Sequence, residues 1–152
     1  MPSPSNPEPI RIAMFSNVPD RVERLSTMFK PPIGHDTFDV YLIEGDVDQI
    51  PPSEPFQCLM IDLEGFQNPL NLIRQIRQSR PSLFLIIIDS RCAGELIVNA
   101  VLAGVRGCID PYCDSSTAHQ VVKDVLAGLL CFSPQVMSRV IGRLLESHGS
   151  EG

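Results

Sequence analysis

The sequence predicts an α/β fold, a doubly wound parallel sheet of five strands with one extra helix at the carboxyl end. Short apolar segments alternate along the chain with longer segments whose apolar residues recur at helical spacing. Residues 83–89 are almost wholly apolar, which is typical of a parallel strand buried on both faces. The chain has 152 residues, 43% of them hydrophobic, enough for one domain with its own core. Strict alternation implies right-handed crossovers, with helices on both faces.

The chain is expected to begin with a flexible tail over residues 1–9, which carry four prolines and few apolar side chains. The first strand is expected over 10–15, where the sequence reads IRIAMF. A helix over 17–30 follows because its apolar residues share one face, and the prolines at 31 and 32 stop it.

The next two strands are expected without an ordinary helix between them. The segments FDVYLI (38–43) and FQCLMID (56–62) both have strand character. The acidic, proline-rich residues 44–55 between them are expected to form a loop. The segment over 68–82 predicts an amphipathic helix, with leucines and isoleucines on one side and arginines on or near the other.

The carboxyl half completes the predicted sheet. The strand over 83–89 leads to a helix over 93–104, a short strand over 106–110 and a helix over 115–128. A Ser-Pro pair at 133–134 is expected to cap and begin one more helix.

Composition and charge exclude several classes of function. The net charge is −6 and only two lysines are present, so the chain is not expected to bind nucleic acid or an anionic membrane itself. No apolar run approaches the roughly 18 residues of a membrane span, and the N-terminus lacks a signal-peptide pattern. We therefore expect a cytoplasmic protein.

The five cysteines are odd in number, spread out and without a CxxC pair, so neither a structural zinc nor a disulfide framework is expected. Their thiols are expected to be reduced, and no metal or other cofactor is predicted. Cys58 and Cys108 lie in apolar runs and are interpreted as small core residues.

The sequence also lacks the motifs of an enzyme on this fold. We find neither a G-x-S-x-G elbow nor a glycine-rich loop after the first strand. His35, His119 and His148 are isolated, and each is expected at the surface. A binding module is therefore predicted, not an enzyme.

Polar residues that follow the strands mark the predicted functional edge, because function in a doubly wound sheet lies at the carboxyl ends of the strands. Asp62 ends the otherwise apolar CLMID and is the main candidate. The full set at this edge is Ser16, Asn17, Asp62, Asp89, Ser90, Asp110 and Pro111.

The stretches AGVRGCID and DVLAGLLCFSPQVMSRVIGRLL resemble the receiver domain of NarL/LuxR-type response regulators. The resemblance covers roughly residues 10–146 and implies a flavodoxin-like receiver fold. It implies a receiver-like domain over 10–130, a helix or linker over 131–147 leading toward an output domain, and a tail over 148–152.

The resemblance places Asp62 at the phosphoacceptor position. A typical receiver also uses a divalent metal, held partly by an acidic pair after the first strand, a hydroxyl after the fourth strand and a lysine after the fifth. Here Ser16 and Asn17 replace the acidic pair, so the binding of magnesium should be weak.

The other two supporting positions are also changed. Asp89, with Ser90 adjacent, aligns with the hydroxyl position, where a carboxylate would repel an aspartyl phosphate. Asp110 or Pro111 aligns with the lysine, depending on a one-residue shift. The departures indicate an atypical receiver, or pseudo-receiver.

Three interpretations of Asp62 stay open. It is a strand-end carboxylate capped by backbone N–H groups or satisfied by Ser16 and Asn17. It is a working phosphoacceptor. Or it approaches Asp89 and Asp110, and the three carboxylates share a proton or attract a cation. The changed supporting groups favour the first.

The resemblance thus implies a signal-input and dimerisation module in transcriptional regulation, without conventional aspartyl phosphorylation. A phosphorylatable two-component receiver and a stand-alone signalling adaptor are the alternatives. A histidine kinase or another signalling protein is the expected partner, and DNA is expected to be contacted only through an output domain absent from this chain.

A homodimer is expected through one of two regions. The first contains the apolar segments LIVNAVLAGV and VVKDVLAGLL. The second is the final helix, whose Val140 and Leu144 have no obvious place in a five-stranded core and could pair with another copy.

Overall fold

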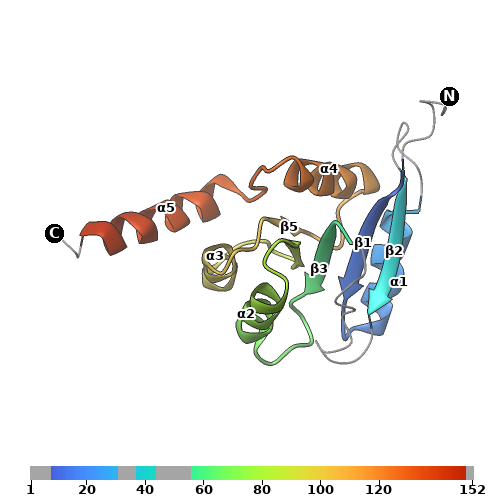
Figure 1. Ribbon diagram of the computed structural model, residues 1–152, viewed down its shortest axis with the longest axis horizontal. Helices are drawn as coiled ribbons and strands as arrows, with labels where there is room; N and C mark the ends of the chain where they lie inside the picture. The colour runs from blue at the N-terminus through green and yellow to red at the C-terminus, as the bar shows by residue number, and fades with distance from the viewer. Residues whose placement is uncertain (1–7, 31–36, 44–55, 150–152) are drawn as a thin grey trace.

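The computed structural model describes residues 8–30, 37–43 and 56–149, which form five strands and five helices. All strand pairs are parallel, the strand order is β2-β1-β3-β4-β5, and helices cover both faces (Figure 1). This confirms the predicted doubly wound sheet. The elements are β1 (Ile10–Phe15), α1 (Pro19–Met28), β2 (Phe38–Ile43), β3 (Cys58–Asp62), α2 (Pro69–Ser79), β4 (Phe84–Ile88), α3 (Glu95–Leu102), β5 (Gly107–Ile109), α4 (Ser115–Leu126) and α5 (Pro134–Gly149).

Two hydrophobic clusters lie on opposite faces of the sheet, because successive side chains of a strand point to opposite sides. Helices α1 and α4 cover one face with residues such as Leu25 and Val122. Helices α2 and α3 cover the other with residues such as Ile73 and Val98. Strands β3 and β4 contribute to both clusters, and apart from the half-buried Phe84 all their residues are buried, as predicted for the centre of a parallel sheet.

The predicted elements and the observed ones differ mainly at their ends, where helices and strands fray. Strand β3 begins at Cys58, two residues after the expected start, and α3 is shorter than the expected 93–104. The expected loop over 44–55 and residues 1–7 of the expected tail lie outside the described residues. The domain limits at 130 and 147 stay predictions, and α5 continues to Gly149.

Helix α5 starts as predicted and then runs past α3, away from the sheet (Figure 1). The hydroxyl of Ser133 accepts a hydrogen bond from the backbone N–H of Val136 at 3.2 Å, and Pro134 is the first helical residue. Val136 and Val140 are buried in the cluster that α2 and α3 cover. The prediction that Val140 lacks a place in the core is therefore wrong, because α5 extends that cluster beyond α3.

Charged groups hold α5 against α3. Arg139 and Arg143 both pair with Glu95, which lies in the first turn of α3. Arg143 also donates from Nη1 to Asn99 Oδ1 at 3.2 Å. Residues 134–143 of α5 are thus fixed to the domain by apolar and ionic contacts.

His119 is buried, so the prediction of a surface position is wrong for this residue. Its ring stacks on Phe29 and lies against Phe38, with centroids 5.3 and 4.4 Å away. Its Nε2 lies 2.8 Å from the carbonyl oxygen of Met28. His119 faces inward because α4 packs over the end of α1. His35 and the side chain of His148 lie outside the described residues.

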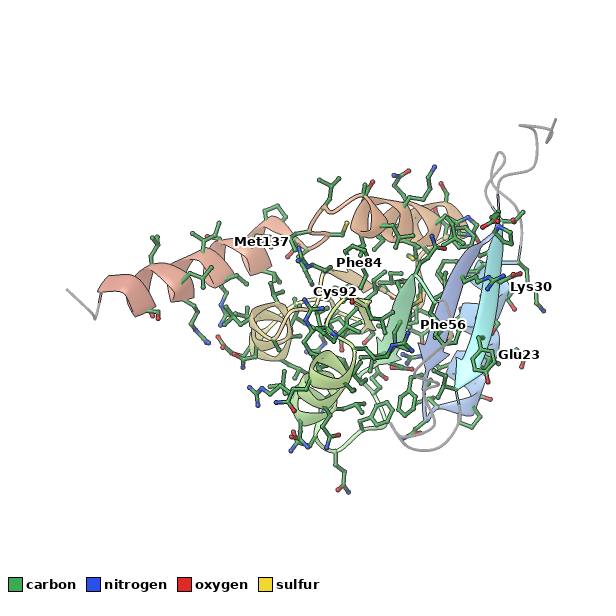
Figure 2. The ribbon with its side chains drawn as sticks, viewed as in Figure 1. Glu23, Lys30, Phe56, Phe84, Cys92 and Met137 are labelled. Atoms are coloured by element: carbon green, nitrogen blue, oxygen red, sulfur yellow. A yellow bond between two sulfur atoms is a disulfide. The ribbon has the colours of Figure 1, made fainter. Side chains whose placement is uncertain are left out.

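Cys92 and Cys108 form a disulfide, and Figure 2 shows Cys92 in the loop between β4 and α3. Strands β4 and β5 are neighbours, so this loop lies beside β5 and the two Cα atoms are 5.8 Å apart, as a disulfide requires. The prediction of reduced, unpaired thiols is wrong for this pair. Cys58, Cys113 and Cys131 are free.

Candidate functional site

Asp62 is the last residue of β3 and is fully buried. Ser16, directly after β1, donates from its hydroxyl to Asp62 Oδ2 at 3.1 Å. The backbone N–H of Glu64 donates to Asp62 Oδ1, also at 3.1 Å. Because β1 and β3 are adjacent parallel strands, their carboxyl ends bring these groups to one edge of the sheet. Asp62 therefore makes the contacts expected of a strand-end carboxylate.

Arg21, in the first turn of α1, supplies a cation to this carboxylate. The residue is only 8% exposed. Its Nη1 lies 3.5 Å from Asp62 Oδ1, and its Nη2 lies 2.9 Å from Glu64 Oε2. The planar guanidinium thus bridges the buried carboxylate and the more exposed one, a geometry that a lysine ammonium cannot reproduce.

Tyr112, in the loop after β5, lies over the arginines of α1. The centre of its ring is 5.8 Å from the guanidinium carbon of Arg21 and 4.7 Å from that of Arg24, distances suited to cation–π contacts. A groove of about 780 Å³ between α1 and this loop is lined by these residues and also by Asp20 and Glu23. Both signs of charge line the groove, so it is not built for one class of ion.

Burial raises the pKa of Asp62 above its ordinary value, and the charge of Arg21, the hydroxyl of Ser16 and the N–H of Glu64 offset this only in part. The pKa of Glu64 is lowered, chiefly by its hydrogen bond from Arg21, and Ser90 adds to this effect through its hydroxyl and N–H. For Arg21, burial acts to lower the pKa, but the carboxylates outweigh it and the pKa is raised. The arginine is therefore charged at all ordinary pH values.

The predicted carboxylates after β4 and β5 face their own loops. Asp89 Oδ2 accepts from the backbone N–H groups of Arg91 and Cys92, at 3.1 and 3.0 Å. Asp110 Oδ1 accepts from the N–H of Tyr112 at 2.8 Å. These are turns in which an aspartate caps the backbone two or three residues later. The structure thus does not bring Asp89 and Asp110 together with Asp62 into an acidic crevice.

The remaining predicted residues have smaller roles. Asn17 makes no polar contact with Asp62 in the part of the chain that the structure describes, and it lies close to Gly65. A β-carbon at Gly65 would be 3.3 Å from Asn17 Cβ, and the φ of +93° favours glycine there. Pro111 is buried beneath the groove.

The receiver fold suggests a divalent metal at Asp62, but the residues present do not fit one. Within residues 8–30, 37–43 and 56–149, no group of three histidine, cysteine or acidic side chains could hold a metal ion. Ser16 offers a neutral hydroxyl, and the guanidinium of Arg21 lies on the side of Asp62 Oδ1. A hard dication prefers several anionic oxygen ligands, and this site offers a cation instead.

A scan against protein-family models finds no match, and a search of curated proteins finds no significant match. The solved structures do show similar folds. A two-component response regulator of the LuxR family from Aurantimonas sp. SI85-9A1 aligns with a TM-score of 0.69 at 16% identity, over 91% of this chain and 99% of that one. The chain has the fold of a response-regulator receiver domain.

Two further receivers support this assignment of the fold. The response regulator ChrA of a heme-sensing two-component system aligns with a TM-score of 0.65 at 18% identity, over 88% of this chain. The isolated receiver domain of RcsB from Salmonella enterica serovar Typhimurium, solved with the phosphomimetic BeF3-, gives 0.63 at 17%, over 88% of this chain and 99% of that one. The present chain spans only 65% of the ChrA chain.

Sequence reasoning missed Arg21, Glu64 and Tyr112. Arg21 lies 41 residues from Asp62 in the chain. In the helical pattern of residues 17–30 it looks like an ordinary polar residue of the exposed face. One signal was present: Arg21 is in the first turn of a helix that follows β1, and this turn lies at the functional edge. No helix in the described part of this chain has the length and apolar character needed to cross a membrane.

We expect Arg21→Met to lower the free energy of unfolding by about 3 kcal/mol at neutral pH, because a buried carboxylate loses its cation. The loss should shrink as the pH falls. Because the pKa of Asp62 is raised, its ionisation lowers the stability of the fold as the pH rises through that pKa. Arg21 reduces this loss, so its removal matters most where Asp62 is ionised. The lowered pKa of Glu64 means that its ion pair stabilises the fold above the unfolded pKa and is lost on acidification.

Urea unfolding at several pH values measures this effect. Arg24→Met is the matched control, because Arg24 lies in the same helix but contacts the ring of Tyr112 and no carboxylate among the described residues. It should cost less than about 1 kcal/mol at every pH. A loss in Arg21→Met that is equally large in acid would contradict the ion-pair account.

Proposed function

We propose that this chain is a signal-input and dimerisation module that works without conventional aspartyl phosphorylation. It is a binding module and not an enzyme. The observation that carries the proposal is the Arg21 guanidinium, 3.5 Å from the Asp62 carboxylate at the position where a receiver would take its phosphoryl group. The guanidinium of Arg21 takes the place of the metal ion that phosphorylation of a typical receiver requires.

The electrostatics of the site support this interpretation. Phosphoryl transfer needs cations to neutralise the oxygens of the incoming group. A magnesium ion bound by Asp62 would lie within a few ångströms of the Arg21 charge, and two like charges at that distance repel. Arg21 cannot easily turn away, because its other nitrogen is hydrogen-bonded to Glu64 at 2.9 Å.

The packing around Asp62 supports it as well. Asp62 is fully buried, and one of its oxygens already accepts the Ser16 hydroxyl while the other accepts the Glu64 N–H. Burial also raises the pKa of Asp62, which disfavours the ionised nucleophile that phosphorylation requires. Both effects lower the reactivity of this carboxylate.

We expect no change in the NMR spectrum around Asp62 when magnesium and beryllofluoride are added together, because beryllofluoride needs the metal to mimic an aspartyl phosphate. The measurement is a two-dimensional amide titration of the whole chain. The isolated RcsB receiver, whose structure was solved with BeF3-, is the positive control for the reagents.

A variant that restores a carboxylate and removes the internal cation tests why the unmodified chain should show no shifts. Ser16→Asp combined with Arg21→Ala returns a carboxylate beside Asp62 and removes the internal cation. Magnesium should then shift the amides of residues 62–64. Magnesium-dependent beryllofluoride shifts in the unmodified chain, lost in Asp62→Ala, would instead establish the alternative, a phosphorylatable receiver with Asp62 as phosphoacceptor.

The exposed hydrophobic side chains support the dimerisation part of the proposal. Seven of the ten large exposed ones in the described residues lie on α3, which packs against α5, or between the end of α4 and the end of α5. Exposed apolar side chains on neighbouring elements are typical of interaction sites when they form one patch. The members are Leu96, Leu102, Leu129, Leu130, Ile141, Leu144 and Leu145.

Ile141→Glu should shift the chain toward monomer in light scattering, because Ile141 is 52% exposed on the face of α5 that lies away from Val136 and Val140. Burial of the exposed half of such a side chain in a dimer contributes on the order of 1 kcal/mol. Gln135→Glu is the matched control, since it adds the same charge at an exposed position of α5 outside the apolar face. A mass that Ile141→Glu leaves unchanged counts against this interface.

The likeness of the fold to ChrA and the LuxR-family regulator supports a proposal for the setting of the module. We infer a role in transcriptional regulation in the cytoplasm, with DNA contacted through an output domain outside residues 8–149. The partners would be a second copy and other signalling proteins. A histidine kinase is the partner only in the alternative with a reactive Asp62, and a stand-alone adaptor needs no output domain.

A further inference from the structure

We propose that the Cys92–Cys108 disulfide is a reversible redox site, cleaved by low-molecular-weight thiols, whose cleavage releases the loop between β4 and α3. The inference deepens the proposed function and rests on it in one respect: a module that does not use phosphorylation at Asp62 needs another input. In a reducing compartment, disulfides are rare and those that occur are usually transient or redox-sensing.

Few contacts define the shape of the released loop, residues 89–94. The carboxylate of Asp89 accepts from the N–H groups of Arg91 and Cys92, and the disulfide ties Cys92 to β5. Cys92 has a φ of +49°, the left-handed region that non-glycine residues seldom adopt. Such a conformation persists only where its surroundings hold it, and loss of the disulfide removes the one covalent restraint on Cys92.

The loop connects the Asp62 site to α5. Near its start, Ser90 hydrogen-bonds to the carboxylate of Glu64, which in turn binds Arg21. Directly after the loop, Glu95 pairs with Arg139 and Arg143 of α5. The disulfide lies between these two attachment points, so its state can bias both.

A small thiol can reach the bond from the surface. A cavity of about 600 Å³ is lined by both cysteines, and its walls include the exposed residues Ser116, Thr117 and Gln120 of α4. Cys92 is half-buried, whereas Cys108 is only 8% exposed and belongs to the hydrophobic core. The sulfur of Cys92 is therefore the one that an incoming thiolate attacks.

The chemistry balances with two equivalents of a monothiol. The first thiolate attacks Sγ of Cys92, forms a mixed disulfide and releases the Cys108 thiolate, which takes a proton from water. A second thiolate attacks the sulfur of the bound small thiol, releases the Cys92 thiolate and leaves as the oxidised small-molecule disulfide. The protein disulfide gains two electrons and two protons, the two thiols lose them, and the oxidised small molecule drives the reverse reaction.

The three free cysteines do not compete for this role. Burial raises the pKa of Cys58 to about 12, so its thiol stays protonated and inert. Burial, with the charge of Asp124, also raises the pKa of Cys131. Burial, with the charges of Asp110 and Asp114, raises the pKa of Cys113, which lines the groove beside α1 and not this cavity. Cys131 lines the same cavity, but its side chain lies on the α4 side of β5, beside Gly107 and in the opposite cluster from Cys108. The redox chemistry therefore involves Cys92 and Cys108 alone.

The test equilibrates the whole chain in buffers of reduced and oxidised glutathione at graded ratios, followed by acid quenching, alkylation and mass spectrometry. We expect two additional alkylated thiols, at Cys92 and Cys108, with a midpoint within the glutathione series. On reduction, amide hydrogen exchange in residues 89–94 and in the first two turns of α5 should accelerate about tenfold or more, while exchange in β1 and β3 stays unchanged.

Two variants keep the test decisive. Cys131→Ser should leave the titration unchanged, because Cys131 is not part of the exchange. Cys92→Ser should abolish the thiol change and give the rapid exchange of the reduced form in every buffer. A thiol count that never changes, or exchange rates that are equal in both states, overturns the inference. Magnesium-dependent beryllofluoride binding would overturn the proposed function and leave this result intact, so the two failures are distinguishable.

Discussion

The contact between the Arg21 guanidinium and the carboxylates of Asp62 and Glu64 explains most of the candidate site. A carboxylate buried at the end of a central strand is costly to ionise unless a charge or hydrogen bonds compensate it. In typical receivers a metal ion compensates this charge, and the same ion neutralises the oxygens of the incoming phosphoryl group. Here the compensating charge belongs to α1 and does not dissociate. The charge that compensates Asp62 is therefore part of the protein itself.

The parts of the fold that depend on local pattern could be predicted from the sequence. The apolar run of β4 and the Ser133-Pro134 start of α5 are set by neighbouring residues, and both are observed. Contacts between distant residues could not be predicted: Arg21 is 41 residues from Asp62, and the neighbourhood of Cys92 and Cys108 depends on strand order. His119 was misplaced for the same reason, because its burial depends on how α4 packs over α1.

The candidate site shows the same division. The position of Asp62 and its hydrogen bonds from the Ser16 hydroxyl and the Glu64 backbone N–H follow from strand-end geometry, and the sequence suggested them. The side-chain directions of Asp89 and Asp110 did not follow, because each caps its own loop and turns away from the crevice. Glu64 has two roles. Its carboxylate pairs with Arg21, and it also accepts hydrogen bonds from Ser90, in the loop that the disulfide restrains. The contacts of Glu64 therefore belong both to the site around Asp62 and to the loop that leads to α3 and its contacts with α5.

The most direct measurement of the central claim is the pKa of Asp62 itself, followed by the ¹³C signal of its carboxyl carbon in the unmodified chain and in Arg21→Met. The account predicts a pKa above the ordinary aspartate value in the unmodified chain, since burial outweighs the compensation. It predicts a still higher pKa in the variant, because the nearest positive charge is gone. An Asp62 titration that is the same in both proteins would contradict the claim that Arg21 is the resident cation of this site.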